Sequence, residues 1–373
     1  MVLGPLMVLG ARMHAVAPRV VLVTGVSRYF AAQVAARLAA DPRVDRVVGV
    51  DETEPTGVAA SLLPAVDYRR ADISSPGIAR LVTDAGVDTV LHLAVVAGPT
   101  GAGGRDAMKE LNVIGTLQLL SACQHAPTVR RLVVRSSTAA YGASPRDPAI
   151  FTERTALRAM PRGGYAKDVV EIEGYVRGFR RRRPDTAVTV LRFAPFVGSR
   201  ADTMLTRYFS LPVVPTVLGH DPRIQFVHAD DAVEVACRAA REDHSGDFNV
   251  AGPGVLLLSQ AIRRAGRVPW PMPDPAMTAV AQLARRSGLV DFSLDQLDFL
   301  VHGRVVDVRR LIDDFGYRPR STPEAFDDFI AGHGMGAPVD AGGLDAAERL
   351  LRTGGRAVLS GLRSVLSAKG DRP

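Results

Sequence analysis

The chain has 373 residues, enough for one large domain with an added lobe or for two domains. Hydrophobic residues make up 47% and charged residues 23%, as in globular proteins, and no apolar run reaches the roughly 18 residues that a membrane span needs. The net charge of +7 comes mostly from arginines that are scattered along the chain, and this dispersed charge does not favour a nucleic-acid partner. The chain has only two cysteines, Cys123 and Cys237, which excludes a disulfide scaffold and a zinc site.

Residues 1–18 are expected to form an N-terminal extension. The first ten are apolar, but they lack a basic segment and a small-residue cleavage site, so we expect no signal peptide and a cytoplasmic protein. Met7 and Met13 leave open a later start of the chain.

Apolar strands and helical patterns alternate through the first two thirds of the chain. The predicted strands are Val20–Thr24, Asp45–Val50, Asp67–Arg70, Asp88–Leu93, Arg131–Arg135 and Ala187–Phe193. The predicted helices are Tyr29–Ala40, Pro76–Ala85, Arg105–His125 and Lys167–Phe179. Continuous apolar strands separated by helices favour a parallel sheet covered on both faces. We therefore predict an α/β fold, a Rossmann-type doubly wound parallel sheet, over residues 19–195.

The alternation of strands and helices ends after Phe193, where prolines interrupt the chain. We predict a smaller mixed C-terminal lobe for substrate over residues 196–333, with strands and helices that return to the Rossmann domain. Its expected segments are helices at Asp230–Arg241, Leu258–Ala265, Ala276–Arg286 and Leu294–Leu300 and a loop at Pro269–Pro275.

Residues 334–373 are rich in Gly and Ala and carry a weakly basic amphipathic pattern, which predicts a helical tail broken at Gly354 and Gly355. This tail is expected to pack on the protein or on a second subunit of a homodimer, and contact with a membrane surface is the alternative. The basic run Arg180–Arg183 follows a helix, whose negative end it complements, with an anion or membrane surface as the alternative partner.

The first strand, turn and helix have the pattern of a dinucleotide site. A strand ends at Thr24 and a helix begins near Tyr29, so free backbone N–H groups and the positive helix end would face a pyrophosphate. The turn residues expected to contact the cofactor are Gly25, Ser27, Arg28, Tyr29 and Phe30. Asp51 ends the second strand, where a carboxylate accepts from a ribose 2′-hydroxyl and repels a 2′-phosphate. This pattern favours NAD over NADP.

From about Val20 to Gly332 the chain resembles the extended (atypical) short-chain dehydrogenase/reductase family, in its NAD-dependent epimerase/dehydratase group, and within it UDP-glucose 4-epimerase-like proteins. The turn in that family reads TGxxGxxG, whereas here Arg28 and Ala31 stand at the second and third glycines. Arg28 implies either a shifted loop or an arginine that itself contacts phosphate. Other segments that resemble the family's cofactor contacts are Asp72 with Ile73, Leu93 with Ala94 after the fourth strand, and the helix residue Asn112.

The resemblance also implies a catalytic set: a tyrosine that transfers the hydroxyl proton, a lysine four residues later that lowers the pKa of this tyrosine and holds the nicotinamide ribose, and a serine or threonine that orients the substrate oxygen. Ser137 falls on the serine position, although its hydroxyl could equally serve a turn at the end of a strand.

The tyrosine–lysine pair is incomplete. Tyr165 would need a lysine at position 169, which is Val169, and Lys167 would need a tyrosine at position 163, which is Gly163. Residues two apart on a helix point to nearly opposite sides, so Tyr165 and Lys167 cannot form the pair themselves. Either Tyr165 works without its lysine, or Lys167 keeps the ribose contact without a tyrosine, or the site only binds.

Expected substrate contacts are also altered. The asparagine of the family's LRxxN segment falls on Pro195, and the arginine four residues before His228 falls on Ile224, with Arg223 displaced by one. The loop Gly98–Gly104 is expected to be a flexible lid, with an anion cradle as the alternative.

The sequence therefore predicts an NAD-dependent epimerase/dehydratase-like oxidoreductase or isomerase, acting on a nucleotide-sugar or a related hydroxyl-bearing small molecule without a metal. The alternative is a catalytically degenerate NAD-binding regulatory or sensor protein. The incomplete pair leaves open whether the chain is an enzyme.

Overall fold

The computed structural model describes residues 18–98, 104–157, 164–274 and 294–336. The predicted helix Ala276–Arg286, the tail from residue 337 onward and the centre of the Gly98–Gly104 loop lie outside the described residues.

A seven-stranded parallel sheet forms the larger domain, in the order β3-β2-β1-β4-β5-β6-β11. Its strands are β1 (Val20–Thr24), β2 (Arg46–Asp51), β3 (Asp67–Arg70), β4 (Thr89–His92), β5 (Arg131–Ser137), β6 (Ala187–Phe193) and β11 (Gly246–Val250). The central strands are buried on both faces, as their continuous apolar sequences predict. The predicted Rossmann-type doubly wound sheet is confirmed.

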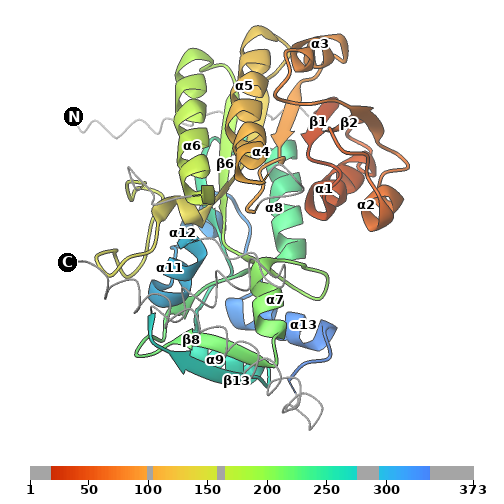
Figure 1. Ribbon diagram of the computed structural model, residues 1–373. Helices are drawn as coiled ribbons and strands as arrows, with labels where there is room; N and C mark the ends of the chain where they lie inside the picture. Colours follow the sequence, from red (N-terminus) through yellow and green to blue (C-terminus); the bar gives the residue numbers. More distant parts are fainter. Residues whose placement is uncertain (1–17, 99–103, 158–163, 275–293, 337–373) are drawn as a thin grey trace, which may run out of the picture.

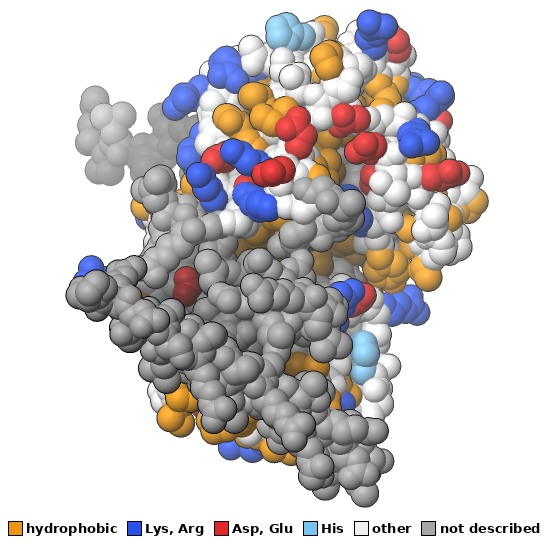
Figure 2. All heavy atoms as spheres, viewed as in Figure 1, with side chains coloured by type: hydrophobic (Ala, Val, Ile, Leu, Met, Phe, Trp, Pro, Cys, Tyr) orange, Lys and Arg blue, Asp and Glu red, His pale blue; other side chains and the backbone are white. Residues whose placement is uncertain are grey.

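Helices cover both faces of this sheet (Figure 1). They are α1 (Tyr29–Ala39), α2 (Gly57–Leu62), α3 (Gly77–Asp84), α4 (Gly104–Lys109), α5 (Gly115–His125), α6 (Gly164–Arg182) and α8 (Ala229–Arg241). Helices α3, α5 and α6 pack together on one face, while α1 and α8 pack together on the other. On the side of α5 and α6, acidic and basic side chains are interspersed over the surface (Figure 2).

The predicted continuous helix Arg105–His125 is wrong in one respect, because a π-helical turn η1 (Glu110–Ile114) divides it into α4 and α5. The packing of Gly115 explains part of this arrangement: a Cβ on Gly115 would lie 2.8 Å from Cγ1 of Ile73, so the helix runs unusually close to the segment after β3. The wide turn carries Asn112, which is fully buried.

The smaller C-terminal lobe has its own apolar core below the carboxyl ends of the strands. Its described residues form three two-stranded pairs: β7 (Phe196–Val197) with β10 (Val227–His228), β8 (Val213–Val217) with β13 (Val268–Met272), and β9 (Arg223–Ile224) with β12 (Leu256–Leu257). The helices are α7 (Met204–Ser210), α9 (Leu258–Arg264), α11 (Leu294–His302), α12 (Arg309–Asp313) and α13 (Thr322–Gly332). In addition, the 3-10 turn η2 (Thr138–Tyr141) follows β5.

The loop predicted at Pro269–Pro275 is wrong, because most of it is strand β13, which pairs with β8 in parallel. Pro269 and Pro271 fit this strand because a proline is tolerated where one edge has no partner. Within the described parts of the chain, no helix combines the length and the apolarity needed to cross a bilayer.

Candidate functional site

The turn after β1 lies beside the end of β4, where the connections of the sheet diverge to opposite faces. Gly25 has a φ of 85°, and a Cβ there would lie 2.8 Å from Cα of Ala94. A side chain is therefore excluded both by conformation and by space. The N–H of Gly25 donates to the Val50 carbonyl over 2.8 Å, and the Gly25 carbonyl accepts from the N–H of Arg28 over 3.1 Å. These bonds close a tight turn at the start of α1.

Asp51 is held at the end of β2, beside this turn. One carboxylate oxygen accepts from the Ser27 N–H at 3.0 Å and from the Ser27 hydroxyl at 2.7 Å. The other accepts from the Thr53 N–H at 3.2 Å. The carboxylate is thus fixed at the place where the sequence predicts a ribose contact.

Arg28 occupies an ordinary extended conformation, with φ of −100° and ψ of 140°, at the N-cap of α1. The backbone at this position does not require glycine. Its guanidinium lies 3.8 Å from Asp51, and burial lowers its pKa while the charge of Asp51 opposes that shift. The turn itself is therefore retained, and the arginine is added beside it.

The remaining predicted cofactor residues differ in their surroundings. Asp72 accepts from the N–H and hydroxyl of Ser74, and Ile73 is buried against Gly115. The N–H groups of Leu93 and Ala94 donate to the Thr24 hydroxyl at 3.1 and 3.2 Å.

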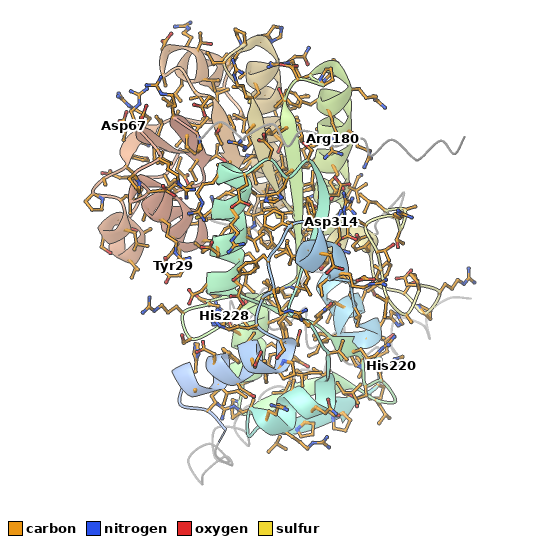
Figure 3. The ribbon with its side chains drawn as sticks, turned by 180° about the vertical axis from the view of Figure 1, so that it is seen from behind. Tyr29, Asp67, Arg180, His220, His228 and Asp314 are labelled. Atoms are coloured by element: carbon orange, nitrogen blue, oxygen red, sulfur yellow. The ribbon has the colours of Figure 1, made fainter. Side chains whose placement is uncertain are left out.

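Two residues of the α1 turn point in different directions. The hydroxyl of Tyr29 accepts from Gln33 at 2.7 Å, whereas Phe30 packs inward against Phe193 and Phe196, with ring centroids 5.7 and 5.0 Å away. Figure 3 places Tyr29 at the level where the sheet meets the C-terminal lobe.

Asn112 is bonded through both ends of its amide. Its oxygen accepts from the Val96 N–H at 2.9 Å, and its nitrogen donates to the Val96 carbonyl at 2.9 Å and to Asp168 at 3.0 Å. Asp168 is itself buried and pairs with Arg105, which also donates to the carbonyl of Gly164. The π-helical turn thus connects the segment after β4 to the first turn of α6.

A pocket of about 830 Å³, including space open to solvent, lies at the carboxyl ends of β5 and β6. Ser137, the last residue of β5, and Tyr165, in the first turn of α6, both line it. The Ser137 hydroxyl lies near enough to Tyr165 to lower the pKa of this tyrosine, and the Ser137 oxygen accepts from the N–H of Ala139 at 3.1 Å. The serine therefore serves the turn and lies beside the tyrosine as well.

The pKa of Tyr165 is raised above its ordinary value, although the surrounding groups act in both directions. Burial raises its pKa, and the negative charge of Asp168 adds to that shift. The positive charge of Arg135, the nearby hydroxyl of Ser137 and the positive charge of Arg304 all lower its pKa. Among these groups, Arg135 has the largest opposing effect.

Lys167 is not brought to this pocket. Its side chain is exposed on α6, and it does not belong to the residues that line the cavity. Val169, at the position where the lysine of the pair is expected, is completely buried in the protein interior. Of the three predicted catalytic residues, the structure therefore brings together only Ser137 and Tyr165.

The altered substrate positions have structural roles in part. Pro195 lines the pocket, while Ile224 is buried in the core of the C-terminal lobe. Arg223 donates to the carbonyl of Ala149 at 3.1 Å. His228 lies at the start of α8, above the C-terminal lobe in Figure 3, and contacts Asp328 of α13 at 3.0 Å.

Two arginines of the pocket were not predicted from the sequence. Arg135 lies two residues before Ser137 on β5, and Arg304 follows α11 and donates to the carbonyl of Gly142 at 2.7 Å. The alternation of β5 places Arg135 on the same face as Ser137, which was a signal available in the sequence. The position of Arg304 depends on how the C-terminal lobe folds back. In the described residues, no cluster of metal-binding side chains occurs.

Comparison with known proteins gives a consistent family. Residues 21–251 match the model of the NAD dependent epimerase/dehydratase family. An uncharacterized protein of Mycobacterium tuberculosis is 44% identical over 328 residues, which are 88% of this chain and 87% of that protein. A trifunctional UDP-glucose 4,6-dehydratase, epimerase and reductase of Arabidopsis thaliana is 26% identical over 172 residues, 44% of this chain and 25% of that protein.

Solved structures share the fold. The UDP-glucose 4-epimerase of Thermotoga maritima, with UDP-glucose, matches with a TM-score of 0.65 and 18% identity over 84% of this chain and 98% of that one. The dTDP-glucose 4,6-dehydratase of Bacillus anthracis, in complex with NAD, matches with a TM-score of 0.64 and 14% identity over 85% and 96% of the two chains.

Proposed function

Because this chain belongs to the NAD-dependent epimerase/dehydratase family, we propose that it binds NAD and reversibly oxidises a hydroxyl-bearing carbon of a nucleotide-sugar or related small molecule. One observation carries the proposal: a tyrosine and a serine, Tyr165 and Ser137, line the same pocket at the carboxyl ends of the strands. Ligands of doubly wound sheets bind at this edge.

The residues present fit the dinucleotide. The Gly25 turn leaves the N terminus of α1 open to a pyrophosphate, and no side chain could replace this glycine beside Ala94. Asp51 would accept from the adenosine ribose, and its charge disfavours a 2′-phosphate. Arg28 would add a positive charge next to the pyrophosphate.

Tyr165 and Ser137 would handle the substrate hydroxyl. When bound, NAD supplies the acceptor and donor of hydride. Tyr165 would take the hydroxyl proton during oxidation and return a proton during reduction, while Ser137 holds the same oxygen in place. With Tyr165 and Ser137 placed in this way, the proton would move only between the substrate oxygen and the Tyr165 hydroxyl oxygen, within the pocket.

The nucleotide-sugar class is supported by the solved relatives, which hold UDP-glucose and other nucleotide-linked sugars. The pocket of this chain has a wall formed by Phe193–Phe196 and a second wall from Met204, Leu205 and Phe299. An apolar pocket with few polar groups orients a ligand through those groups. Here the polar side chains are those of Arg135, Ser136, Ser137, Tyr165, Thr203 and Arg304.

The experiment compares wild type with Tyr165→Phe. We expect both proteins to bind NAD with similar affinity in isothermal titration, because the hydroxyl contacts the substrate side of the pocket. On a panel of UDP- and dTDP-sugars, turnover followed by reduced nicotinamide absorbance and product chromatography should fall by about 10² to 10⁴ in Tyr165→Phe. Tyr175→Phe, a partly buried tyrosine on the same helix outside the pocket lining, is the control.

A second candidate function is NAD sensing without turnover. Two observations favour it: the side chain of Lys167 is exposed, and Val169, at the position of the family's lysine, is a buried apolar residue. No lysine is therefore placed beside Tyr165 by helix α6. NAD binding with no turnover on any substrate, in wild type as in Tyr165→Phe, would support this function. Absence of NAD binding would contradict both functions.

A further inference from the structure

Arg135 is held in an unusual setting at the end of β5. Its guanidinium carbon lies 5.3 Å from the ring centroid of Phe30 and 5.3 Å from that of Phe196. The two rings are 5.0 Å apart and tilted by 49°. Stacking on aromatic faces fixes a guanidinium without using up its N–H donors. Arg135 also lines the pocket at the carboxyl ends of β5 and β6.

No acidic side chain compensates Arg135 in the parts of the chain that the structure describes. The guanidinium borders the pocket but is otherwise surrounded by protein, so burial lowers its pKa. Tyr165, from α6, raises this pKa, and Arg28, from the N-cap of α1, lowers it further. A cation that is largely enclosed by protein and has no acidic partner among the described residues is costly, and proteins retain such groups mainly at functional sites.

We propose that Arg135 is a positioning residue that takes over the electrostatic role of the missing lysine, stabilising the phenolate of Tyr165 from the neighbouring strand instead of from the same helix. The inference rests on the proposed function, because it assigns a partner to the proton-transferring tyrosine. In the family pattern the cation is a lysine at position 169, where this chain has the buried Val169. In this chain the cation is Arg135, on β5.

The other charges around Tyr165 support this assignment. Asp168, on α6 itself, is the acidic group near the hydroxyl, and its charge is balanced by the ion pair with Arg105 of α4. Arg304 faces Tyr165 from the segment after α11, but its guanidinium is bonded to the Gly142 carbonyl and lies 5.3 Å from the ring of Phe299. Its effect on the pKa of Tyr165 is smaller than that of Arg135.

Arg135 neither gives nor takes a proton in the proton-transfer step. In oxidation, the O–H bond of the substrate breaks and the Oη–H bond of Tyr165 forms, so the phenolate becomes neutral. NAD, when bound, would accept the carbon-bound hydrogen together with its electron pair. Arg135 keeps its own proton throughout, since a guanidinium stays charged under conditions in which a buried lysine would lose its charge.

The test is a titration that needs neither substrate nor cofactor. The pKa of Tyr165 is measured by NMR of the protein carrying ¹³C-labelled tyrosine, and Tyr165→Phe assigns its resonance. In Arg135→Met we expect the pKa of Tyr165 to rise by about one to three pH units relative to wild type. Arg135→Lys should keep it near the wild-type value, and Arg304→Gln, the matched control in the same pocket, should shift it less than Arg135→Met does.

Folding is checked in the same proteins. Because Arg135 has no acidic partner among the described residues, we expect Arg135→Met to be at least as stable as wild type in thermal denaturation. An unchanged pKa of Tyr165 in folded Arg135→Met would overturn the inference, as would a lower melting temperature combined with a normal titration, which marks a structural arginine. If Arg135→Met does not fold, the same structural role is indicated and the inference is rejected.

The outcome is separable from that of the proposed function. A wild-type protein that binds no NAD contradicts the proposed function whatever the tyrosine titration shows. Where a substrate is found, the pH profile of kcat should move to higher pH in Arg135→Met and return in Arg135→Lys. A purely structural role of Arg135 would change kcat or KM without moving that profile.

Discussion

His92, at the end of β4, is held as a neutral imidazole by a chain of hydrogen bonds. The Thr116 hydroxyl donates to the carbonyl of Asn112, so it must accept from Nε2 of His92, 2.7 Å away. Nδ1 is then an acceptor, and the Thr24 hydroxyl donates to it over 3.0 Å. Thr24 in turn accepts the N–H groups of the segment after β4. The tautomer of one imidazole thus helps to fix the backbone beside the cofactor turn.

This arrangement predicts a pH dependence of stability. Burial lowers the pKa of His92 to about 4 from the usual value near 6.5, so the unfolded chain binds a proton before the folded chain does. The free energy of unfolding should therefore decrease as the pH falls from about 6.5 to 4, by about 3 kcal/mol from this residue. In urea denaturation at several pH values, His92→Gln should show a shallower slope over that window. Equal slopes in the two proteins would contradict the assignment.

Asp51 is the second residue for which a measurable effect of substitution is expected, here on dinucleotide binding. Its carboxylate would bind the ribose hydroxyls, so Asp51→Ala should weaken NAD binding by about ten- to a hundredfold, the value of hydrogen bonds to a charged group. The variant should also lose its preference for NAD over NADP, because the repulsion of the 2′-phosphate is removed. Isothermal titration with both dinucleotides measures this.

The control for Asp51 is Asp67→Ala, at the opposite end of the neighbouring strand, where the carboxylate pairs with Arg69 at 2.9 Å (Figure 3). Its NAD affinity should equal that of wild type. An Asp51→Ala protein that discriminates against NADP as strongly as wild type does would show that another group makes the selection.

At the scale of elements, a buried ion pair joins α6 to β6. Glu173 accepts two hydrogen bonds from Arg192, at 2.9 and 2.7 Å, and one from Ser136 of β5 at 2.6 Å. Arg192 also donates to the Tyr141 hydroxyl at 2.8 Å. The side chains of the pair are only 2% and 3% exposed, so neither charge can be left to solvent. The pair therefore sets the position of α6, the helix that carries Tyr165.

The consequence for stability is asymmetric. Arg192→Met should cost about 3 to 5 kcal/mol, because it leaves the Glu173 carboxylate buried and unpaired. The double variant Arg192→Met with Glu173→Gln should recover a large part of that loss, since the carboxylate of Glu173 is then replaced by a neutral amide. Asp247, which also pairs with Arg192 at 3.0 Å, keeps its ion pair with Arg180. Guanidinium denaturation measures both proteins. A double variant as unstable as the single one would show that shape, not charge, dominates here.

The sequence predicted the first six strands of the main sheet, all but β3 from apolar runs, and most of the helices between them. It did not predict the short helix α2, and β3 is a short polar strand. It missed β11, whose sequence contains Asp247 and Asn249 and follows a polar segment, so its apolar pattern is weak. It assigned β13 to a loop because of Pro269 and Pro271, although parallel pairing with β8 tolerates both. Tertiary contacts, not local sequence, decide these two strands.

The candidate site was predicted to a similar extent. Gly25 and Asp51 follow from spacing along the chain, as does the placement of Ser137 at the end of a strand. The pairing of Arg105 with Asp168 and the approach of Arg135 to Tyr165 could not be predicted, because each joins elements that are distant in sequence. The exposure of Lys167 likewise depends on which face of α6 meets the sheet.

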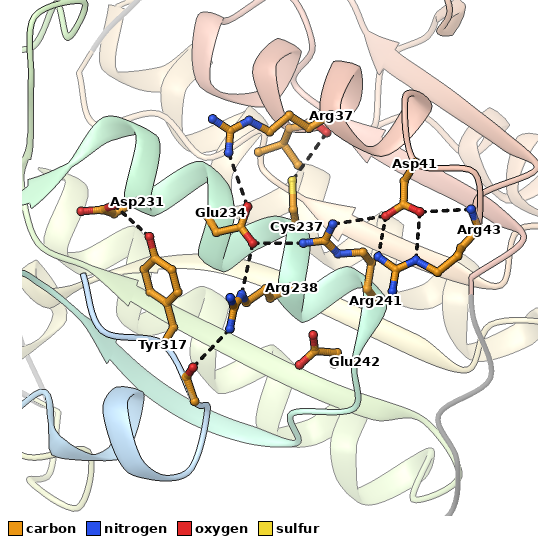
Figure 4. Close-up of polar contacts among 12 residues, drawn as sticks. Arg37, Asp41, Arg43, Asp231, Glu234, Cys237, Arg238, Arg241, Glu242 and Tyr317 are labelled. Carbon is orange, nitrogen blue, oxygen red and sulfur yellow. Dashed lines mark hydrogen bonds and ion pairs between the residues drawn. The ribbon is translucent and has the colours of Figure 1, made fainter. Parts of the chain in front are cut away.

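At the scale of the whole molecule, the chain returns from the C-terminal lobe to complete the larger domain. Strand β11 pairs with β6, and α8 packs against α1. Ion pairs connect these helices, with Arg37 at 3.5 Å from Glu234 and Arg241 at 3.2 Å from Asp41 (Figure 4). Eight residues of α8 are buried. The larger domain therefore includes elements from both halves of the sequence.

A chain ending at residue 195 should consequently fail to fold as a unit. It would expose the edge of β6 and the apolar face of α1 that α8 covers. We expect this fragment to aggregate or to lack a near-ultraviolet circular dichroism signal, whereas the full chain unfolds in a cooperative transition. A soluble 1–195 fragment with cooperative unfolding and normal NAD binding would show instead that the first 195 residues are an independent domain.

The extended backbone of Arg28 has a consequence for how this site could have changed over time. Glycine codons of the form GGN and arginine codons of the form CGN differ by one base, so a single substitution in the gene exchanges the two residues. Since φ and ψ at position 28 suit any residue, such a change leaves the turn intact and is not removed by selection for folding. By contrast, Gly25, at φ of 85° against Ala94, is not open to the same change. A sequence search that requires glycine at both position 25 and position 28 will therefore overlook chains whose turn has the same conformation but lacks the second glycine.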